Sequence, residues 1–294
     1  MASSRTTRGS RMLPPEVDAR VAAIAADRES GASELAMRAL EAFEAFATVG
    51  PAPAELQELA GTLAAAQPSM AAVRNVAHLC AQLLGEGHEP TLTFQELRRE
   101  LAGAADKIAR NALKVIVGKS IAITLSRSAS VIAVLQILHL RGRLSAVTVL
   151  ESRPRFEGRR TAQELAAAGI PVKLVTDANG PRLVGTSDLV LAGADSVLRD
   201  GGLVNKVGTY GLALAAKAAG KPFYAACEVM KLDATHASDS FPPPAGRPPD
   251  ELDPPPNVVA ENVYFELTPA DLVTSYITDK GVYEPRRIAQ LVTL

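Results

Sequence analysis

Apolar residues in the first third of the chain recur at the spacing of amphipathic helices. Three segments repeat them every three to four residues, and prolines separate these segments from one another. Thr93 followed by Glu96 has the spacing of a capping box, which predicts the start of a further helix. The predicted helices cover residues 34–46, 55–65 and 70–84 and a segment that begins at 93. The pattern therefore predicts a helical N-terminal domain over residues 1–112, with a frayed basic tail.

The hydrophobic pattern changes after Lys114. Short β-branched apolar runs now alternate with helix-length segments, and two of these segments end at glycine. The expected strands lie within 115–125 and at 146–150, 172–175, 188–192 and 222–226, and the expected helices lie at 128–140, 161–168 and 209–219. This alternation is typical of βαβ units and of a parallel sheet covered on both faces. We therefore predict an α/β fold, with a Rossmann-like parallel-sheet domain over residues 113–294 that binds its ligand at the carboxyl ends of the strands.

Residues 241–256 are rich in proline, which predicts a loop with extended backbone rather than a helix or a buried strand. A solvated surface loop, a lid over a site and a subunit contact are all compatible with this composition. Regular structure is expected to resume at 263–267 and 272–277.

Composition and charge narrow the choice of partners. The net charge of −1 gives no reason to expect nucleic acid, and the absence of Trp argues against a base-stacking surface. Cys80 and Cys227 are too few for a disulfide framework, which favours a cytoplasmic location. No apolar run reaches membrane-spanning length, so we expect a soluble protein without a membrane partner. The tail that contains Arg5, Arg8 and Arg11 has no acidic residue and is compatible with a frayed terminus or a short transit peptide.

Polar and cationic residues follow the first two predicted strands. Ser126, Arg127 and Ser128 lie at the end of the first strand and directly before a helix, whose N-terminus can bind phosphate. Alternatively, Ser128 serves only as the N-cap of that helix. Glu151 and Arg153 follow the second strand in an arginine-rich stretch. Arginine binds phosphate bidentately, so we predict substrate contacts at these positions, with a solvated basic loop as the alternative.

The later strand ends carry a carboxylate and an Asn-Lys pair. Asp177 ends the third predicted strand, and Asp195 follows the fourth in a run of small residues. A carboxylate at such a position can act as a general acid or base. Alternatively, Asp195 has only a structural role, because aspartate is also common in turns and helix caps. Asn205 and Lys206 follow a glycine turn and can bind the hydroxyls and phosphate of a sugar, although a surface charge would explain Lys206 equally. Together these strand ends predict one ligand site.

Several of these segments resemble one superfamily. It comprises the α, β and δ regulatory subunits of translation initiation factor 2B together with methylthioribose-1-phosphate isomerase and ribose-1,5-bisphosphate isomerase. The resemblance is carried by Gly-Ala-Asp-Ser at 193–196, Asn-Lys-Val-Gly-Thr at 205–209, Ala215 with Lys217, Pro-Phe-Tyr at 222–224, Gly-Ile-Pro-Val at 169–172 with Asp177, and Glu-Ser-Arg-Pro at 151–154 with Gly158. Gly-Ala at 31–32 and Gln-Pro-Ser-Met at 67–70 resemble the family's N-terminal signatures.

The resemblance implies a helical domain joined to a Rossmann-like domain, a sugar-phosphate ligand and a homodimer formed through the C-terminal domain. In the isomerases of this family, a Cys at the end of the first strand of this domain and the Asp of Gly-Ala-Asp form the catalytic pair. The Asp corresponds to Asp195, whereas the Cys position falls on Ser126. A serine hydroxyl is a far weaker acid than a thiol, so this difference bears directly on catalysis.

Two hypotheses follow from this difference. In the first, the protein is an aldose–ketose isomerase for a substrate such as ribose 1,5-bisphosphate, with Asp195 and Ser126 as the catalytic pair. In the second, it is a regulatory relative that binds a sugar phosphate or nucleotide without turnover. A dinucleotide-dependent dehydrogenase is disfavoured because no G-x-G-x-x-G follows the first strand, and neither a cofactor nor a metal is expected.

Overall fold

The computed structural model describes residues 13–291, and the predicted basic tail lies outside them. The described residues divide into two compact units. The N-terminal unit contains residues 13–30, 34–68 and 73–98, and the C-terminal unit contains residues 31–33, 69–72 and 99–291. The sequence-based boundary at residue 112 stays a prediction.

The N-terminal unit is built from helices, as the apolar spacing predicted. The helices that contribute to it are α1 (Pro15–Ala26), α2 (Ala32–Ala47), α3 (Pro53–Ala66), α4 (Ala71–Gly85) and the start of α5 (Pro90–Ala112). Their apolar faces are fully buried at positions such as Leu35, Phe43 and Leu59. No helix among residues 13–291 is long and apolar enough to cross a membrane.

The predicted capping box at Thr93 is wrong, because α5 begins three residues earlier, at Pro90. Glu89 precedes this helix, and its carboxylate accepts hydrogen bonds from the backbone N–H groups of Thr91 at 2.9 Å and Leu92 at 2.6 Å. These bonds lower the pKa of Glu89. Thr93 instead lies inside the first turn and donates its hydroxyl to the Glu89 carbonyl at 2.9 Å. A proline at the first helical position and an acidic residue before it therefore start the helix.

The C-terminal unit contains a seven-stranded sheet in the order β11-β10-β7-β4-β1-β2-β3. Its strands are β1 (Ser120–Leu125), β2 (Leu144–Leu150), β3 (Val172–Val175), β4 (Leu189–Ala192), β7 (Phe223–Cys227), β10 (Ser275–Thr278) and β11 (Val282–Tyr283). All neighbours pair in parallel except β10 and β11. The predicted α/β fold with a parallel sheet is confirmed.

Helices cover both faces of this sheet because successive strand residues point to opposite sides. Ala122 of β1 packs with α6 (Ala129–Leu140), α7 (Glu157–Ala167) and the last turns of α5. Its neighbour Ile123 packs on the other face with α8 (Gly180–Val184) and α9 (Thr209–Ala219). A short helix, α10 (Pro285–Leu291), follows the sheet.

A second sheet of four strands was not predicted. It has the order β8-β5-β6-β9, with β5 (Ser196–Leu198), β6 (Leu203–Lys206), β8 (Leu232–Asp233) and β9 (Phe265–Thr268). Asp200 to Gly202 form the predicted turn, which lies between β5 and β6, and the Asn-Lys pair is the end of the strand that follows this turn. These strands have only two to four residues, too few to produce a clear alternation in the sequence.

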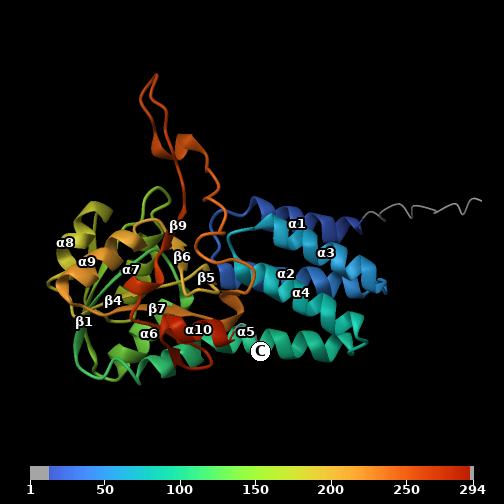
Figure 1. The fold of residues 1–294 in the computed structure, drawn as a ribbon, viewed down its shortest axis with the longest axis horizontal. Coiled ribbons are helices and arrows are strands. Elements are labelled where there is room, and N and C mark those ends of the chain that lie inside the picture. The colour runs from blue at the N-terminus through green and yellow to red at the C-terminus, as the bar shows by residue number, and fades with distance from the viewer. Residues whose placement is uncertain (1–12, 292–294) are drawn as a thin grey trace, which may run out of the picture. The chain divides into compact units, whose positions relative to one another are not determined.

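The Pro-rich segment lies between β8 and β9, and Figure 1 shows it in orange, extending away from both sheets. It contains no α-helix and no named strand, as predicted, but residues Pro249–Leu252 form a turn of 3₁₀ helix that the composition did not predict. The backbone N–H of Arg247 donates to the Asn262 carbonyl at 2.8 Å, and Gly246 forms an isolated bridge with Val263. We call residues 241–262 the arm.

Gly158 in the first turn of α7 lies against the end of β2. A Cβ placed on it would lie 1.8 Å from the Leu150 carbonyl oxygen, which no side chain can accept without a backbone shift. We expect Gly158→Ala to destabilise the protein by about 3 kcal/mol or more in urea unfolding. Gly103→Ala is the control, because nothing lies within 4 Å of a Cβ in that helical position, and it should stabilise by up to about 1 kcal/mol. Equal effects of the two substitutions would contradict the close packing at Gly158.

Candidate functional site

The sheet changes its winding direction between β1 and β4. From β1 the chain proceeds to β2 and β3 on one side, then returns to β4, β7 and β10 on the other. The loops after β1 and β4 therefore leave in opposite directions, which opens a crevice at the carboxyl ends of these two strands. Ser126 directly follows β1, and Gly193 directly follows β4.

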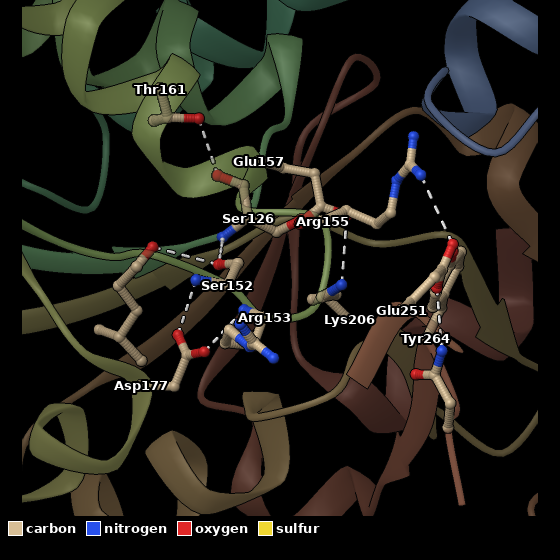
Figure 2. A network of polar contacts seen from close by, with 12 residues as sticks. Ser126, Ser152, Arg153, Arg155, Glu157, Thr161, Asp177, Lys206, Glu251 and Tyr264 are labelled. Atoms are coloured by element: carbon tan, nitrogen blue, oxygen red, sulfur yellow. Dashed lines mark hydrogen bonds and ion pairs between the residues drawn. The ribbon is translucent and has the colours of Figure 1, made fainter. Parts of the chain in front are cut away.

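Ser126 is held in place by hydrogen bonds from two other loops. Its backbone has a positive φ of 59°, an uncommon conformation for a residue other than glycine. Its N–H donates to the Ser152 hydroxyl oxygen at 2.7 Å, and its carbonyl accepts from the Thr161 hydroxyl at 2.7 Å (Figure 2). Both main-chain polar groups of Ser126 are therefore used, which orients its side chain at the end of β1.

Asp177 extends this network to the end of β3. Its two carboxylate oxygens each accept one backbone N–H at 2.7 Å, from Ser152 and from Arg153 (Figure 2). Ser152 also has a positive φ, of 63°. The loops after β1, β2 and β3 are thus connected by the Ser152 hydroxyl and the Asp177 carboxylate. The sequence identified Asp177 as a strand end but not as the anchor of the loop after β2.

The ends of β1, β4 and β6 meet around Gly193. A Cβ on Gly193 would lie 2.8 Å from the Ser128 Cβ and 3.8 Å from Asn205 Oδ1. Ser128 caps α6 by accepting the Val131 N–H at 3.4 Å, so its predicted alternative role as a cap is present in the structure. Asn205 donates from Nδ2 to the Thr209 hydroxyl at 2.9 Å. The lack of a side chain at Gly193 lets these strand ends approach.

Lys206 is buried, with an exposed fraction of 3%. Its Nζ lies 3.2 Å from Oε1 of Glu157, which begins α7, and 5.0 Å from the centre of the Tyr264 ring (Figure 2). A buried ammonium needs such partners, because burial in a medium of low polarity penalises the charge. Lys206 therefore meets a carboxylate and an aromatic ring at the end of β6.

A second buried lysine was missed by the sequence reasoning. Lys231 Nζ lies 2.8 Å from Glu228 Oε2, just after β7, and both side chains are buried. Although burial opposes both charges, each partner favours the other, which raises the pKa of Lys231 and lowers that of Glu228. Glu228 Oε1 also accepts hydroxyl hydrogen bonds from Ser130 at 2.7 Å and Ser33 at 3.0 Å. The same strand-end rule, applied after residue 226, would have identified this pair.

Asp195 lies among these charges and is partly buried. Loss of solvation raises the pKa of its carboxyl from 3.8 to about 6. Lys231 and Lys206 oppose this rise, while the carboxylates of Glu228 and Glu157 add to it. A carboxyl with this pKa can accept and return a proton near neutral pH.

Three of the predicted substrate-binding residues have other partners. Arg127 Nε lies 2.9 Å from Glu164 Oε1 on α7, and both side chains are about 40% exposed. Glu151 Oε2 lies 2.9 Å from Arg159 Nη2. The Arg153 guanidinium lies 5.0 Å from the centre of the Phe156 ring. The predicted residues that the structure brings together are thus Ser128 and Asn205 around Gly193, and Asp195 near Lys206.

The N-terminal signature segments at 31–33 and 69–72 belong to the C-terminal unit. Ser33 contacts Glu228, as described above, and the Ser196 hydroxyl donates to the Ser69 carbonyl at 2.8 Å. The same hydroxyl oxygen accepts the Ala71 N–H at 2.9 Å. These bonds place two distant stretches of the chain directly beside the residues that follow β4 and β7.

Neither cysteine is suited to supply the thiol that the resemblance implies at the position of Ser126. Burial raises the pKa of Cys80 to about 12, and it also raises the pKa of Cys227, the last residue of β7. Among the described residues, no group of three or more His, Cys, Asp or Glu side chains is arranged to hold a metal ion.

Because the pKa of Asp195 is raised in the folded protein, the free energy of unfolding should depend on pH. The folded protein holds the Asp195 proton more tightly than the unfolded chain, so stability falls as pH rises from 3.8 to about 6. Asp195→Asn removes this penalty and should stabilise the protein by about 1–3 kcal/mol at pH 8 but hardly at pH 4. Urea unfolding at both pH values tests this, with Asp239→Asn at an exposed position as the control. If Asp195→Asn stabilised the protein equally at pH 4 and pH 8, the ionisation of the Asp195 carboxyl would be excluded as the cause.

Comparisons with known proteins agree with this architecture. A model of the initiation factor 2 subunit family, IF-2B, matches residues 28–285. The methylthioribose-1-phosphate isomerase of Heliobacterium modesticaldum is 41% identical over 164 residues, which cover 52% of this chain and 48% of the isomerase. The translation initiation factor eIF2B subunit alpha of Dictyostelium discoideum is 32% identical over 223 residues, covering 71% of this chain and 67% of that protein.

A solved structure matches almost the whole chain. The crystal structure of Pyrococcus horikoshii translation initiation factor eIF-2B has a TM-score of 0.82 at 30% identity and covers 94% of this chain and 99% of that one. By contrast, this chain spans only about half the length of the isomerase from H. modesticaldum. The family model and these relatives together show that the chain belongs to the initiation factor 2 subunit family.

Proposed function

We propose that this protein binds a sugar phosphate at the carboxyl ends of β1, β4 and β6 and isomerises an aldose 1-phosphate to a ketose phosphate. The observation that carries the proposal is Asp195, a carboxyl with a pKa of about 6 beside the buried lysines Lys206 and Lys231. A proton carrier and fixed positive charges are the two requirements for moving a proton within a phosphorylated sugar. The name of the 41% identical relative, methylthioribose-1-phosphate isomerase, supports this class of substrate.

In the proposed reaction, Asp195 moves a proton between C1 and C2 of the sugar, and Ser126 occupies the acid position. Lys206 and Asn205 bind the phosphate and hydroxyl groups, as their donors at the end of β6 suggest. Arg127 and Arg153 would have to leave Glu164 and Phe156, respectively, to add phosphate contacts. A substrate such as ribose 1,5-bisphosphate has the required aldose 1-phosphate group. We also propose that the protein acts as a homodimer through its C-terminal unit.

A second candidate function is binding without turnover, as in a regulatory subunit. Ser126 favours this function because its hydroxyl is a much weaker acid than the thiol that the family's isomerases have at this position. The Dictyostelium relative is named as an eIF2B alpha subunit, and it matches more of this chain than the isomerase from H. modesticaldum does. In this case Asp195 would have no proton to move, and its removal would leave ligand affinity almost unchanged.

Turnover of ribose 1,5-bisphosphate to ribulose 1,5-bisphosphate separates the two functions. Ligands are first found by thermal shift with a panel of sugar 1-phosphates, and each one is then assayed for isomerisation. We expect Asp195→Asn to lower kcat by about 10²–10⁴-fold, because the proton carrier is lost, whereas Asp239→Asn at an exposed position should leave kcat unchanged. Binding without turnover in the wild-type protein would reject the isomerase and support the regulatory function.

Ser126→Cys tests the acid position directly. If the chemistry is limited by the weak acidity of the hydroxyl, a thiol at the same left-handed backbone position should raise kcat about tenfold or more. Ser126→Ala removes the proton while leaving the backbone bonds to Ser152 and Thr161 available, and it should lower kcat. The measurement is steady-state isomerisation by all three proteins. Equal kcat values for the serine, cysteine and alanine proteins would remove Ser126 from the mechanism.

A further inference from the structure

The arm carries a carboxylate that is surrounded by hydrogen-bond donors. Glu251, in the 3₁₀ turn of the arm, accepts the Tyr264 hydroxyl at 2.5 and 2.6 Å and Asn262 Nδ2 at 2.9 Å. Arg155 Nη1, from the loop after β2, lies 3.5 Å from Glu251 Oε1 (Figure 2). One carboxylate therefore connects the arm to the loop of a distant strand end.

Two of these donors are buried and lie beside the candidate site, whereas Arg155 is exposed. Asn262 and Tyr264 are each 5% exposed. Lys206 Nζ lies 5.0 Å from the centre of the Tyr264 ring, and the Arg247 guanidinium lies at the same distance from it. The Tyr264 carbonyl also accepts the N–H of Val207, the residue after Lys206, at 2.8 Å. Tyr264 is thus fixed to the end of β6 by its main chain and contacts Lys206 with its ring.

The surroundings of Glu251 favour a negative charge. Burial alone would raise the pKa of its carboxyl, but the hydrogen bonds from Tyr264 and Asn262 and the charges of Arg155 and Lys206 keep this pKa below its usual value. A guanidinium, an ammonium, a phenol and an amide are also the groups that bind the oxygens of a phosphate. An anion from solution would therefore meet the same donors, with Glu251 as its competitor.

The competitor has an advantage because it is part of the same chain. A tethered carboxylate is present at a high effective concentration, so a free anion must displace it to bind. Displacement breaks the hydrogen bonds to Glu251. The bridge between Gly246 and Val263 and the hydrogen bond from Arg247 to the Asn262 carbonyl can remain. The Glu251 contact is therefore suited to exchange with a ligand.

We propose that Arg155, Asn262 and Tyr264, together with Lys206, form an oxyanion-binding site that Glu251 occupies in the free protein. The phosphoryl group of a ligand replaces the Glu251 carboxylate and releases the 3₁₀ turn of the arm. The exchange involves no covalent step. This proposed oxyanion-binding site depends on the proposed function in one respect, because both sites include Lys206. It does not require turnover.

The test compares anion affinities by titration calorimetry in the full-length protein. We expect Glu251→Gln to bind inorganic phosphate about tenfold more tightly than the wild type, because the competing charge is gone. Asp250→Asn removes the same charge from an exposed neighbour in the same turn and should change the affinity less than about twofold. Adding Tyr264→Phe to Glu251→Gln should weaken phosphate binding relative to Glu251→Gln alone, because the competing carboxylate is already absent; unchanged binding would remove Tyr264 from the proposed site. Unchanged or weaker binding by Glu251→Gln in a protein with wild-type unfolding behaviour would overturn the proposal.

A second measurement needs no substitution. Hydrogen exchange of the wild-type protein, with and without phosphate, should show faster exchange of the arm amides when phosphate is bound, whereas slower or unchanged exchange there overturns the proposal. Titration with ribose 5-phosphate beside inorganic phosphate distinguishes a sugar ester from the free anion as the preferred ligand. Phosphate exchange with Glu251 but no isomerisation would reject the proposed enzyme while keeping this inference. If the protein isomerises its substrate but Glu251→Gln does not bind phosphate more tightly, the proposed enzyme stands and this inference is rejected.

Discussion

Two buried ammonium groups constrain the strand ends of the C-terminal unit. Lys206 and Lys231 lose most of their hydration on folding, and each is stabilised by a carboxylate within 3.2 Å, Glu157 or Glu228. Burying one member of such a pair without the other would leave an uncompensated charge, which is strongly destabilising. The helix start at Glu157 and the turn after β7 must therefore form together with the two lysines. Asp195 is exposed to the field of both pairs, which is why its proton affinity depends on residues far away in the chain.

The loops at these strand ends have a well-defined backbone conformation, because several hydrogen bonds hold each of them. Ser126 and Ser152 have left-handed backbones, a conformation that persists only where the surroundings hold it in place. The Ser152 hydroxyl and the Asp177 carboxylate supply that support, and Gly158 allows α7 to begin against the β2 carbonyl. Such over-determined geometry favours a site that is formed before its ligand arrives.

Ser126 separates the two proposed functions, because the resemblance implies a thiol at this position in the isomerases. In both proposed functions, the charges around Asp195 would bind a phosphorylated ligand whether or not a proton is moved. Turnover additionally requires an acid of suitable strength at the end of β1. In the proposed exchange, an anion that replaces Glu251 frees the arm, a segment that extends away from both sheets (Figure 1). Binding and arm release can therefore be coupled in an enzyme or in a regulatory subunit.

The sequence by itself determined the helical first part, the parallel sheet and the position of α9, because these depend on local periodicity and on glycine and proline positions. It also predicted Asp195 and Lys206 as site residues. Asp195 follows a strand of the parallel sheet, whose strand ends meet at one edge, whereas Lys206 ends β6 of the second sheet, which pairs antiparallel with both of its neighbours. Only the tertiary structure decided that Lys206 pairs with Glu157, that Lys231 and Glu228 join the cluster, and that Arg127 turns to Glu164. The second sheet and the contact of Glu251 with Tyr264 also required it. The reason is physical: which charges meet depends on distances across the fold, and a single chain's local pattern contains no information about those distances.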